Sequence, residues 1–208
     1  MKNIHKKDKW PAILMTLSVN PYGEKSYWDE IYEKKPENFE WVENYDTLKD
    51  FITSHVNKTD KILIPGCGNS ELGPEMIKDG YTTIDNTDFS QVVIDHMKKI
   101  HPDQNWFVDN CRKMDIPDNT YDVVLEKSVI DALVTRDDDE AAVFETLSEY
   151  TRVLKKGGRA FIISFGQAPD RENYFKAANA TWKYEGFIKL PREVAPNNYR
   201  HIYTISKP

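Results

Sequence analysis

The sequence predicts an α/β fold in which helices cover both faces of a doubly wound, mostly parallel sheet. Short apolar runs alternate with amphipathic segments along the chain, the pattern of strand–helix–strand units joined by right-handed crossovers. A glycine loop, GCGNS at residues 66–70, follows the first apolar run, and Asp88 ends the second. Ligands of such sheets bind outside the carboxyl ends of the strands, so both features are expected at a binding site.

The alternation can be followed through the first half of the chain. Residues 46–56 predict a helix, because their apolar side chains recur every three and four residues. Gly80 provides a left-handed helix end and Ser90 a side-chain N-cap, which delimit the helices that follow. The expected elements are strands at residues 61–65, 81–88 and 106–108 and helices at 71–78 and 91–100.

The second half continues the alternation and adds a pair of C-terminal strands. The residues Lys155–Gly158 (KKGG) are expected to form a turn between a helix and the next strand. The expected elements are strands at 121–125, 159–164, 184–190 and 199–206 and helices at about 137–154 and 172–180.

Composition limits the classes of function. A chain of 208 residues with 39% hydrophobic residues can bury one sizeable core. Its net charge of −6 disfavours binding to nucleic acid, which needs clustered lysine and arginine. A basic protein or a small molecule fits this net charge better than nucleic acid does.

Cysteine usage and the N-terminal segment predict a cytoplasmic protein. Cys67 and Cys111 are too few for a disulfide framework and stand at no metal-ligand spacing, so we expect reduced cysteines and no metal. Residues 10–19 imitate the apolar part of a secretory signal, but they contain Pro11 and offer no cleavage site. Nothing in the sequence is long and apolar enough for a membrane span, and we expect a monomer.

The glycine loop and Asp88 together indicate a nucleoside ligand. Gly66 and Gly68 permit torsions and close approaches that a Cβ would forbid, and the helix behind them presents unpaired N–H groups. A plain strand-to-helix turn would not need an acid at the end of the second strand. Asp88 stands about twenty residues after the loop, where an acid accepts hydrogen bonds from ribose hydroxyls.

Two nucleoside cofactors compete for this site, a nicotinamide dinucleotide and S-adenosylmethionine. The dinucleotide fingerprint has a third glycine at the position of Glu71, where a pyrophosphate would dock on the helix end. A carboxylate there disfavours the dinucleotide. S-adenosylmethionine carries no phosphate, and its amino-acid end can be held by a glycine loop with polar neighbours.

Five segments resemble class I (seven-β-strand) S-adenosylmethionine-dependent methyltransferases, in the branch of the elongation factor 1-alpha lysine methyltransferases and methyltransferase-like 13. They occur in order from about residue 27 to residue 164, roughly two thirds of the chain, and their combination is more specific than any one of them. The segments are YWDEIYEKKPENFEW, ILIPGCGNSELG, IDNTDFSQVVIDHM, MDIPDNTYDVVLEKSVIDAL and RVLKKGGRAFIIS.

The resemblance implies a Rossmann-like sheet of seven strands, mostly parallel with an antiparallel last strand. It implies a single domain over residues 1–208, with residues 1–45 as a leader that includes a lid over S-adenosylmethionine. In the cofactor site it places Gly66 at the methionine moiety, Asp88 at the ribose, Phe89 beside the adenine, and Asn110 and Cys111 at the adenine ring. Cys67 and Gly68, in the same loop as Gly66, are also expected to bind the cofactor. Asn110 stands where the family has Asp, and its carbonyl can still accept from the exocyclic amine.

The aromatic residues Trp28, Tyr32 and Trp41 lie upstream of the first strand. Trp28 and Tyr32 are four residues apart and share one helical face, so they could simply pack a helix onto the domain. The resemblance implies instead that these rings fold over the cofactor. A sulfonium cation suits an aromatic face, an interaction of about 0.5–2 kcal/mol.

Three further residues are candidates for the catalytic centre. Lys127 directly follows the strand at 121–125, where it could be an ordinary strand-end lysine paired with Glu126 or solvent, and the resemblance places it in contact with the cofactor. Glu126 and Asp131 are candidate acids near the acceptor, although Asp131 also fits a helix cap.

The resemblance implies that the acceptor is a lysine of a protein similar to elongation factor 1-alpha. Methyl transfer to an amine is an in-line displacement, to which a protein contributes alignment and desolvation. The acidic run DDDE at 137–140 could attract a basic substrate or could simply begin a helix. The residues leave open a small-molecule N- or S-methyltransferase, a non-catalytic regulatory module that binds the cofactor, and an aminopropyltransferase.

Overall fold

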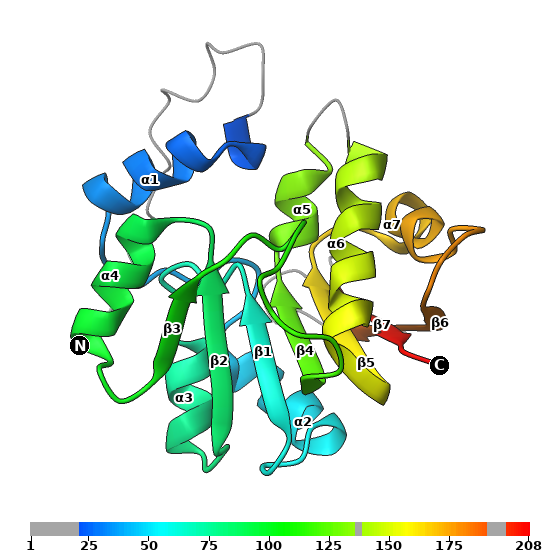
Figure 1. Cartoon of the computed structure of the whole chain (residues 1–208), viewed down its shortest axis with the longest axis horizontal. Helices are drawn as coiled ribbons and strands as arrows, with labels where there is room; N and C mark the ends of the chain where they lie inside the picture. Colours follow the sequence, from blue (N-terminus) through cyan, green and yellow to red (C-terminus); the bar gives the residue numbers. More distant parts are fainter. Residues whose placement is uncertain (1–20, 136–138, 191–198) are drawn as a thin grey trace, which may run out of the picture.

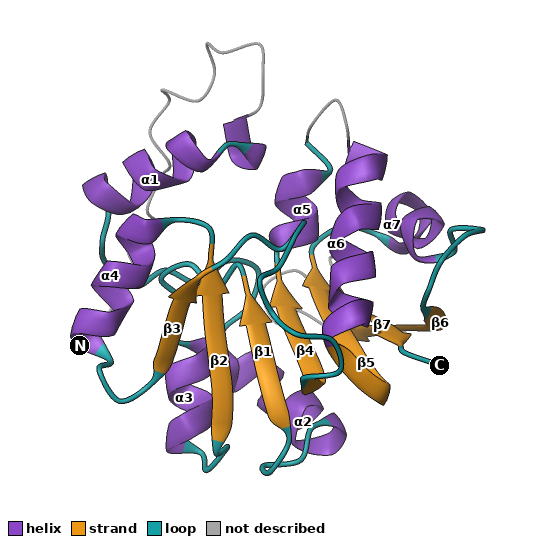
Figure 2. Cartoon of the chain, in the orientation of Figure 1, coloured by secondary structure: helices purple, strands orange, loops and turns teal. Residues whose placement is uncertain are grey.

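The computed structural model describes residues 21–135, 139–190 and 199–208 and confirms the α/β class. A seven-stranded sheet crosses the molecule in the order β3-β2-β1-β4-β5-β7-β6, with helices on both of its faces (Figure 2). Strands β1 to β5 pair in parallel, and β7 runs antiparallel to both of its neighbours, β5 and β6. The predicted sheet with an antiparallel last strand is therefore confirmed.

The elements agree closely with the alternation that the sequence predicts. The strands are β1 (Lys61–Pro65), β2 (Thr83–Asp88), β3 (Asn105–Val108), β4 (Tyr121–Lys127), β5 (Leu154–Ser164), β6 (Lys183–Leu190) and β7 (Arg200–Ser206). The helices are α1 (Lys25–Lys34), α2 (Tyr45–His55), α3 (Leu72–Lys78), α4 (Gln91–Ile100), α5 (Val129–Leu133), α6 (Asp139–Val153) and α7 (Ala168–Phe175), and a 3-10 turn, η2 (Pro21–Gly23), precedes them.

Three segments differ from the prediction. The KKGG segment is part of β5 rather than a separate turn, because Gly157 N donates to Lys207 O and Lys207 N donates to Gly158 O. Helix α7 covers 168–175 instead of 172–180, since Pro169 in its first turn favours an earlier start. Helix α5 has five residues and is too short for a periodic pattern to show.

The core consists of two apolar layers, one on each face of the sheet. Ile62 and Ile64 point into the layer beneath α2, α3 and α4, while Leu63 points into the layer beneath α5, α6 and α7. All three are buried, as expected for a strand in the middle of a parallel sheet.

Two helices lie beyond the carboxyl ends of the strands, the end of the sheet at which ligands bind in such folds. Helices α1 and α5 lie beyond the carboxyl ends of the central strands, at the top of the view in Figure 1. Among the described residues, no helix combines the length and apolar character that crossing a membrane requires.

Candidate cofactor site

A cavity of about 520 Å³ lies between the carboxyl ends of the strands, the leader and α5. Its lining includes every residue that the sequence analysis assigns to the cofactor, although these residues are spread over a hundred positions of the chain. They are Trp28, Tyr32, Trp41, Gly66, Cys67, Gly68, Asp88, Phe89, Asn110, Cys111 and Lys127. The fold therefore brings the predicted residues together at one place.

The glycine loop needs both of its glycines. Gly66 and Gly68 have φ values of +58° and +52°, in the left-handed region that favours glycine. A Cβ on Gly66 would overlap the Cγ2 methyl of Val129, and a Cβ on Gly68 would lie 2.8 Å from the Tyr32 hydroxyl. The loop is bare because α5 and the leader both pack directly against its backbone.

Asp88 ends β2 and joins the glycine loop to the start of α4. Its carboxylate accepts hydrogen bonds from Gly68 N at 3.0 Å and Ser90 N at 2.9 Å. Burial raises the pKa of this carboxyl to about 6. Each carboxylate oxygen retains a lone pair that can accept from a ligand hydroxyl.

The segment after β3 forms part of the cavity wall. Asp109 N donates to Asp88 O at 3.0 Å, and the Asn110 side-chain oxygen accepts from Arg112 N at 3.0 Å. The Cys111 thiol faces Thr146 Oγ1 at 3.9 Å, and burial raises its pKa to about 12. Cys111 is therefore a neutral wall residue.

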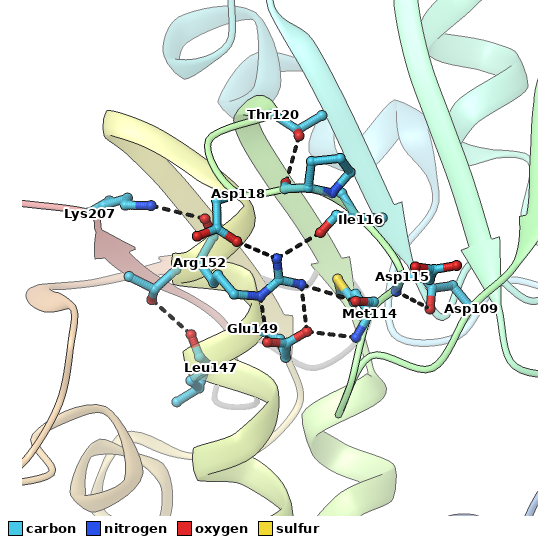
Figure 3. Close-up of polar contacts among 12 residues, drawn as sticks. Asp109, Met114, Asp115, Ile116, Asp118, Thr120, Leu147, Glu149, Arg152 and Lys207 are labelled. Atoms are coloured by element: carbon cyan, nitrogen blue, oxygen red, sulfur yellow. Dashed lines mark hydrogen bonds and ion pairs between the residues drawn. The ribbon is translucent and has the colours of Figure 1, made fainter.

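Helix α6 holds this segment from behind (Figure 3). The Arg152 guanidinium donates to Met114 O, Ile116 O and Asp118 Oδ1, and it pairs with Glu149. Glu149 in turn accepts from Met114 N at 2.6 Å. The wall beside the cavity is thus fixed to a helix that does not itself reach the ligand space.

The leader presents a connected group of aromatic rings to the cavity. Trp28 stacks on Tyr32 with ring centroids 5.8 Å apart, and it meets Trp41 edge-on, also at 5.8 Å. The Trp28 indole donates to Tyr22 O at 2.6 Å. The rings thus pack α1 on the domain and also line the cavity.

Lys127 lies at the end of β4, inside the cavity wall. Its side chain is only 6% exposed, and Nζ donates to Glu40 Oε2 at 2.6 Å and to Trp41 O at 3.1 Å. The partner is thus a residue of the leader rather than Glu126 or solvent.

The two candidate acids have different surroundings. Glu126 is buried and is not among the described residues that line the cavity; its Oε1 accepts from Val129 N and Ile130 N at the start of α5. Burial, and then the neighbouring Asp131, raise the pKa of Glu126 to about 8. Asp131 does line the cavity, but it sits inside α5, and its carboxylate accepts from Ser164 Oγ, Phe165 N and Arg171 Nη2. The side chain that accepts from the N–H groups at the start of α5 is therefore that of Glu126, not that of Asp131.

Sequence reasoning missed several residues of the lining, among them Tyr22, Phe39 and Phe165, and it missed Glu40 beside them. Tyr22 and Phe39 belong to the aromatic run around the predicted ring residues, which was a usable signal. Phe165 follows β5, where no motif marks it. Glu40 matters only through contacts with residues far away in the chain.

Comparison with known proteins identifies the fold. Residues 63–162 match the family model described as a methyltransferase domain. The chain therefore contains a methyltransferase domain. The chain is 32% identical over 195 residues to the mouse eEF1A lysine and N-terminal methyltransferase. This alignment covers 90% of this chain and 27% of that protein. It is 29% identical over 174 residues to the bovine EEF1A lysine methyltransferase 4, covering 77% of this chain and 68% of that one.

The chain thus spans about a quarter of the length of the first curated relatives it matches. A solved structure supports the same fold: the magnesium protoporphyrin IX methyltransferase of Synechocystis, with bound S-adenosylmethionine, has a TM-score of 0.62. The alignment covers 88% of this chain and 97% of that one at 10% identity. The methyltransferase fold that the segments predict is confirmed.

Proposed function

We propose that the protein is an S-adenosylmethionine-dependent methyltransferase that acts on a lysine amine of a protein. The observation that best supports this cofactor is that protein carboxylates already lie at the N-terminus of α3. Glu71 N, where a pyrophosphate would dock, donates to Glu40 Oε1 at 2.7 Å, and the Glu71 carboxylate lies at the same helix end. The start of α3, behind the glycine loop, is thus already occupied by two carboxylates, which leaves no place for a phosphate and suits a phosphate-free ligand.

The cavity residues divide into groups that match the parts of this ligand. Asp88 supplies acceptors for the ribose, Asn110 and Phe89 lie toward the adenine, and the glycine loop with Lys127 lies toward the methionine. Bound S-adenosylmethionine would supply a methyl group already activated by its sulfonium. The aromatic rings of the leader then exclude water and offer their faces to the positive charge.

The acceptor amine must lose a proton before it attacks, because a lysine has a reference pKa of about 10.4. The Asp131 carboxylate already accepts from three donors, so we assign it to holding α5 against the end of β5. Glu126 has the same kind of role at the start of α5. With both acids engaged in this way, we propose that the proton leaves to water.

The protein substrate is inferred from the names of the relatives, which are eEF1A lysine methyltransferases. The net charge of −6 suits a basic substrate. The acidic run at 137–140 lies partly outside the described residues, and it carries no part of the argument. We also propose that the protein is cytoplasmic, because its two cysteines are typical of a reducing compartment, and that it is a monomer.

The cofactor assignment predicts a selective thermal shift. S-adenosylhomocysteine at one hundred times its Kd is expected to stabilise the folded protein by about 2.7 kcal/mol, whereas NAD at the same concentration leaves the melting temperature unchanged. Differential scanning fluorimetry measures both. Equal shifts from the two ligands, or no shift from the first, would contradict the assignment.

The substrate class is tested by incubating the protein with tritiated S-adenosylmethionine and a lysate of the source cells. The expected result is a labelled protein band near the size of elongation factor 1-alpha, with label on lysine after hydrolysis. Label confined to small molecules would replace the protein substrate by a small one. Cofactor binding without any transfer would indicate a regulatory module.

Asp88 predicts a pH dependence of cofactor affinity. The pKa of Asp88 is raised in the ligand-free protein, so the neutral carboxyl stabilises the ligand-free fold at low pH. This contribution to the stability of the ligand-free fold is lost as the pH rises through about 6. Ribose hydroxyls that donate to the carboxylate favour the ionised form. The affinity for S-adenosylhomocysteine is therefore expected to fall about tenfold from pH 7.5 to pH 5.

Isothermal titration calorimetry across this range measures the effect. The matched control is Asp88→Asn, which cannot titrate and whose weaker binding is expected to vary little over the same range. A wild-type affinity that stays constant down to pH 5 would remove Asp88 from the ligand site.

A further inference from the structure

Glu40 makes three contacts that converge from separate parts of the fold. Its Oε1 accepts from Glu71 N at 2.7 Å, and its Oε2 accepts from Ser70 Oγ at 2.8 Å and from Lys127 Nζ at 2.6 Å. The side chain is 25% exposed, whereas that of Lys127 is 6% exposed. One carboxylate of the leader thus connects the start of α3 with the end of β4.

The order of the strands says which part of the ligand lies beside Lys127. Asp88 ends β2, Asn110 follows β3, and Lys127 ends β4 on the other side of β1. A ligand whose ribose lies at Asp88 and whose base lies toward Asn110 must extend its third part past β1 toward β4. For the proposed cofactor, that part is the amino-acid end with its carboxylate.

The ammonium of Lys127 is arranged to receive such a carboxylate. An ammonium has three N–H donors, and within the described residues two of them are used by Glu40 and the Trp41 carbonyl. Both of these acceptors belong to the leader. They fix the direction of the remaining donor, because Lys127 has four flexible side-chain bonds that would otherwise let the ammonium turn away.

We propose that Glu40 is a positioning residue that orients Lys127 toward the carboxylate of the cofactor's amino-acid end. This inference rests on the proposed cofactor. It assigns to the leader a role in recognising one end of the ligand, in addition to covering the cavity. The hydrogen bond from Glu71 N at the start of α3 holds the Glu40 carboxylate in place while Lys127 interacts with the ligand.

The test compares two thioether ligands that differ only at this end. S-adenosylhomocysteine has the amino-acid group, and 5′-methylthioadenosine keeps the adenosine and lacks that group. In Glu40→Gln, the amide can still accept from Glu71 N, so the leader stays attached to α3 while the charge facing Lys127 is lost. Calorimetry is expected to show at least a tenfold loss of affinity for S-adenosylhomocysteine and less than a twofold change for 5′-methylthioadenosine.

The matched control is Glu37→Gln, which removes the same charge from an exposed position of the same leader. It is expected to bind both ligands as the wild type does. If Glu40→Gln weakens both ligands by the same factor, Glu40 only holds the lid, and the positioning role is refuted. If the wild type binds neither ligand, the proposed cofactor itself fails, which is a different result.

A double-mutant cycle with Lys127→Met separates positioning from independent effects. If Glu40 acts through Lys127, Glu40→Gln is expected to cause no further loss of S-adenosylhomocysteine affinity in the Lys127→Met background. A further loss equal to that seen in the wild-type background would show that the two residues act independently, and it would overturn the inference.

Discussion

Replacing Asp88 by alanine is expected to lower the affinity for S-adenosylhomocysteine at least a hundredfold while the domain remains folded. Hydrogen bonds to a charged acceptor contribute about 1.5–3 kcal/mol each, and the ribose has two hydroxyls that can donate to this carboxylate. Losing about 3 kcal/mol corresponds to a factor of more than one hundred in Kd. Calorimetry measures the affinity, and circular dichroism confirms the fold.

The folded state tolerates this change because two effects on stability oppose each other. Alanine leaves the N–H groups of Gly68 and Ser90 without the carboxylate that now accepts from them. It also removes a buried charge whose pKa is raised to about 6, which is an unfavourable contribution at neutral pH. Asp95→Ala, at an exposed position of α4, is the control and is expected to bind normally. Normal binding by Asp88→Ala would mean that the ligand lies elsewhere.

The second large effect is expected for Gly66→Ala, which should lower the free energy of unfolding by about 3 kcal/mol. The φ of +58° costs a residue with a Cβ about 1–2 kcal/mol, and the overlap with the Val129 methyl adds an overpacking cost of about 1–3 kcal/mol. Urea unfolding measures the loss. The affinity for S-adenosylhomocysteine should fall as well, because α5 must move away from the loop.

A second substitution separates the two costs. Combining Gly66→Ala with Val129→Ala removes the methyl that the new Cβ would meet, so the double variant should regain the overpacking part and keep the torsional part. Val129→Ala alone is the control for the lost methyl. A double variant no more stable than additivity predicts would show that the contact with Val129 is not what excludes a side chain at residue 66.

The parts of the site that could be predicted from the sequence depend on local geometry. Gly66 and Asp88 are placed by a strand–loop–helix unit and by the strand beside it, so their spacing along the chain fixes their proximity. Ser90 was predictable for the same reason, because an N-cap acts on the helix that it begins: its Oγ accepts from Val93 N. These inferences need no knowledge of how distant segments pack.

The parts that could not be predicted depend on pairs far apart in the chain. Lys127 and Glu40 are far apart in the sequence, although their side chains are hydrogen-bonded in the fold. No sequence pattern near either residue indicates the other. The roles of Glu126 and Asp131 depend on where the short helix α5 lies, and a five-residue helix leaves no periodic pattern. The hydrogen bonds from Arg152 to the segment after β3 also form only in the folded chain.

The leader extends the cavity-forming part of the chain beyond the matched domain. The matched methyltransferase domain spans residues 63–162, yet residues 22–41 supply one wall of the cavity and the acceptors for Lys127. A version of the protein trimmed to the matched span would keep most of the central sheet and lose the surface that closes over its edge. The matched span is therefore shorter than the fragment that forms a complete cavity.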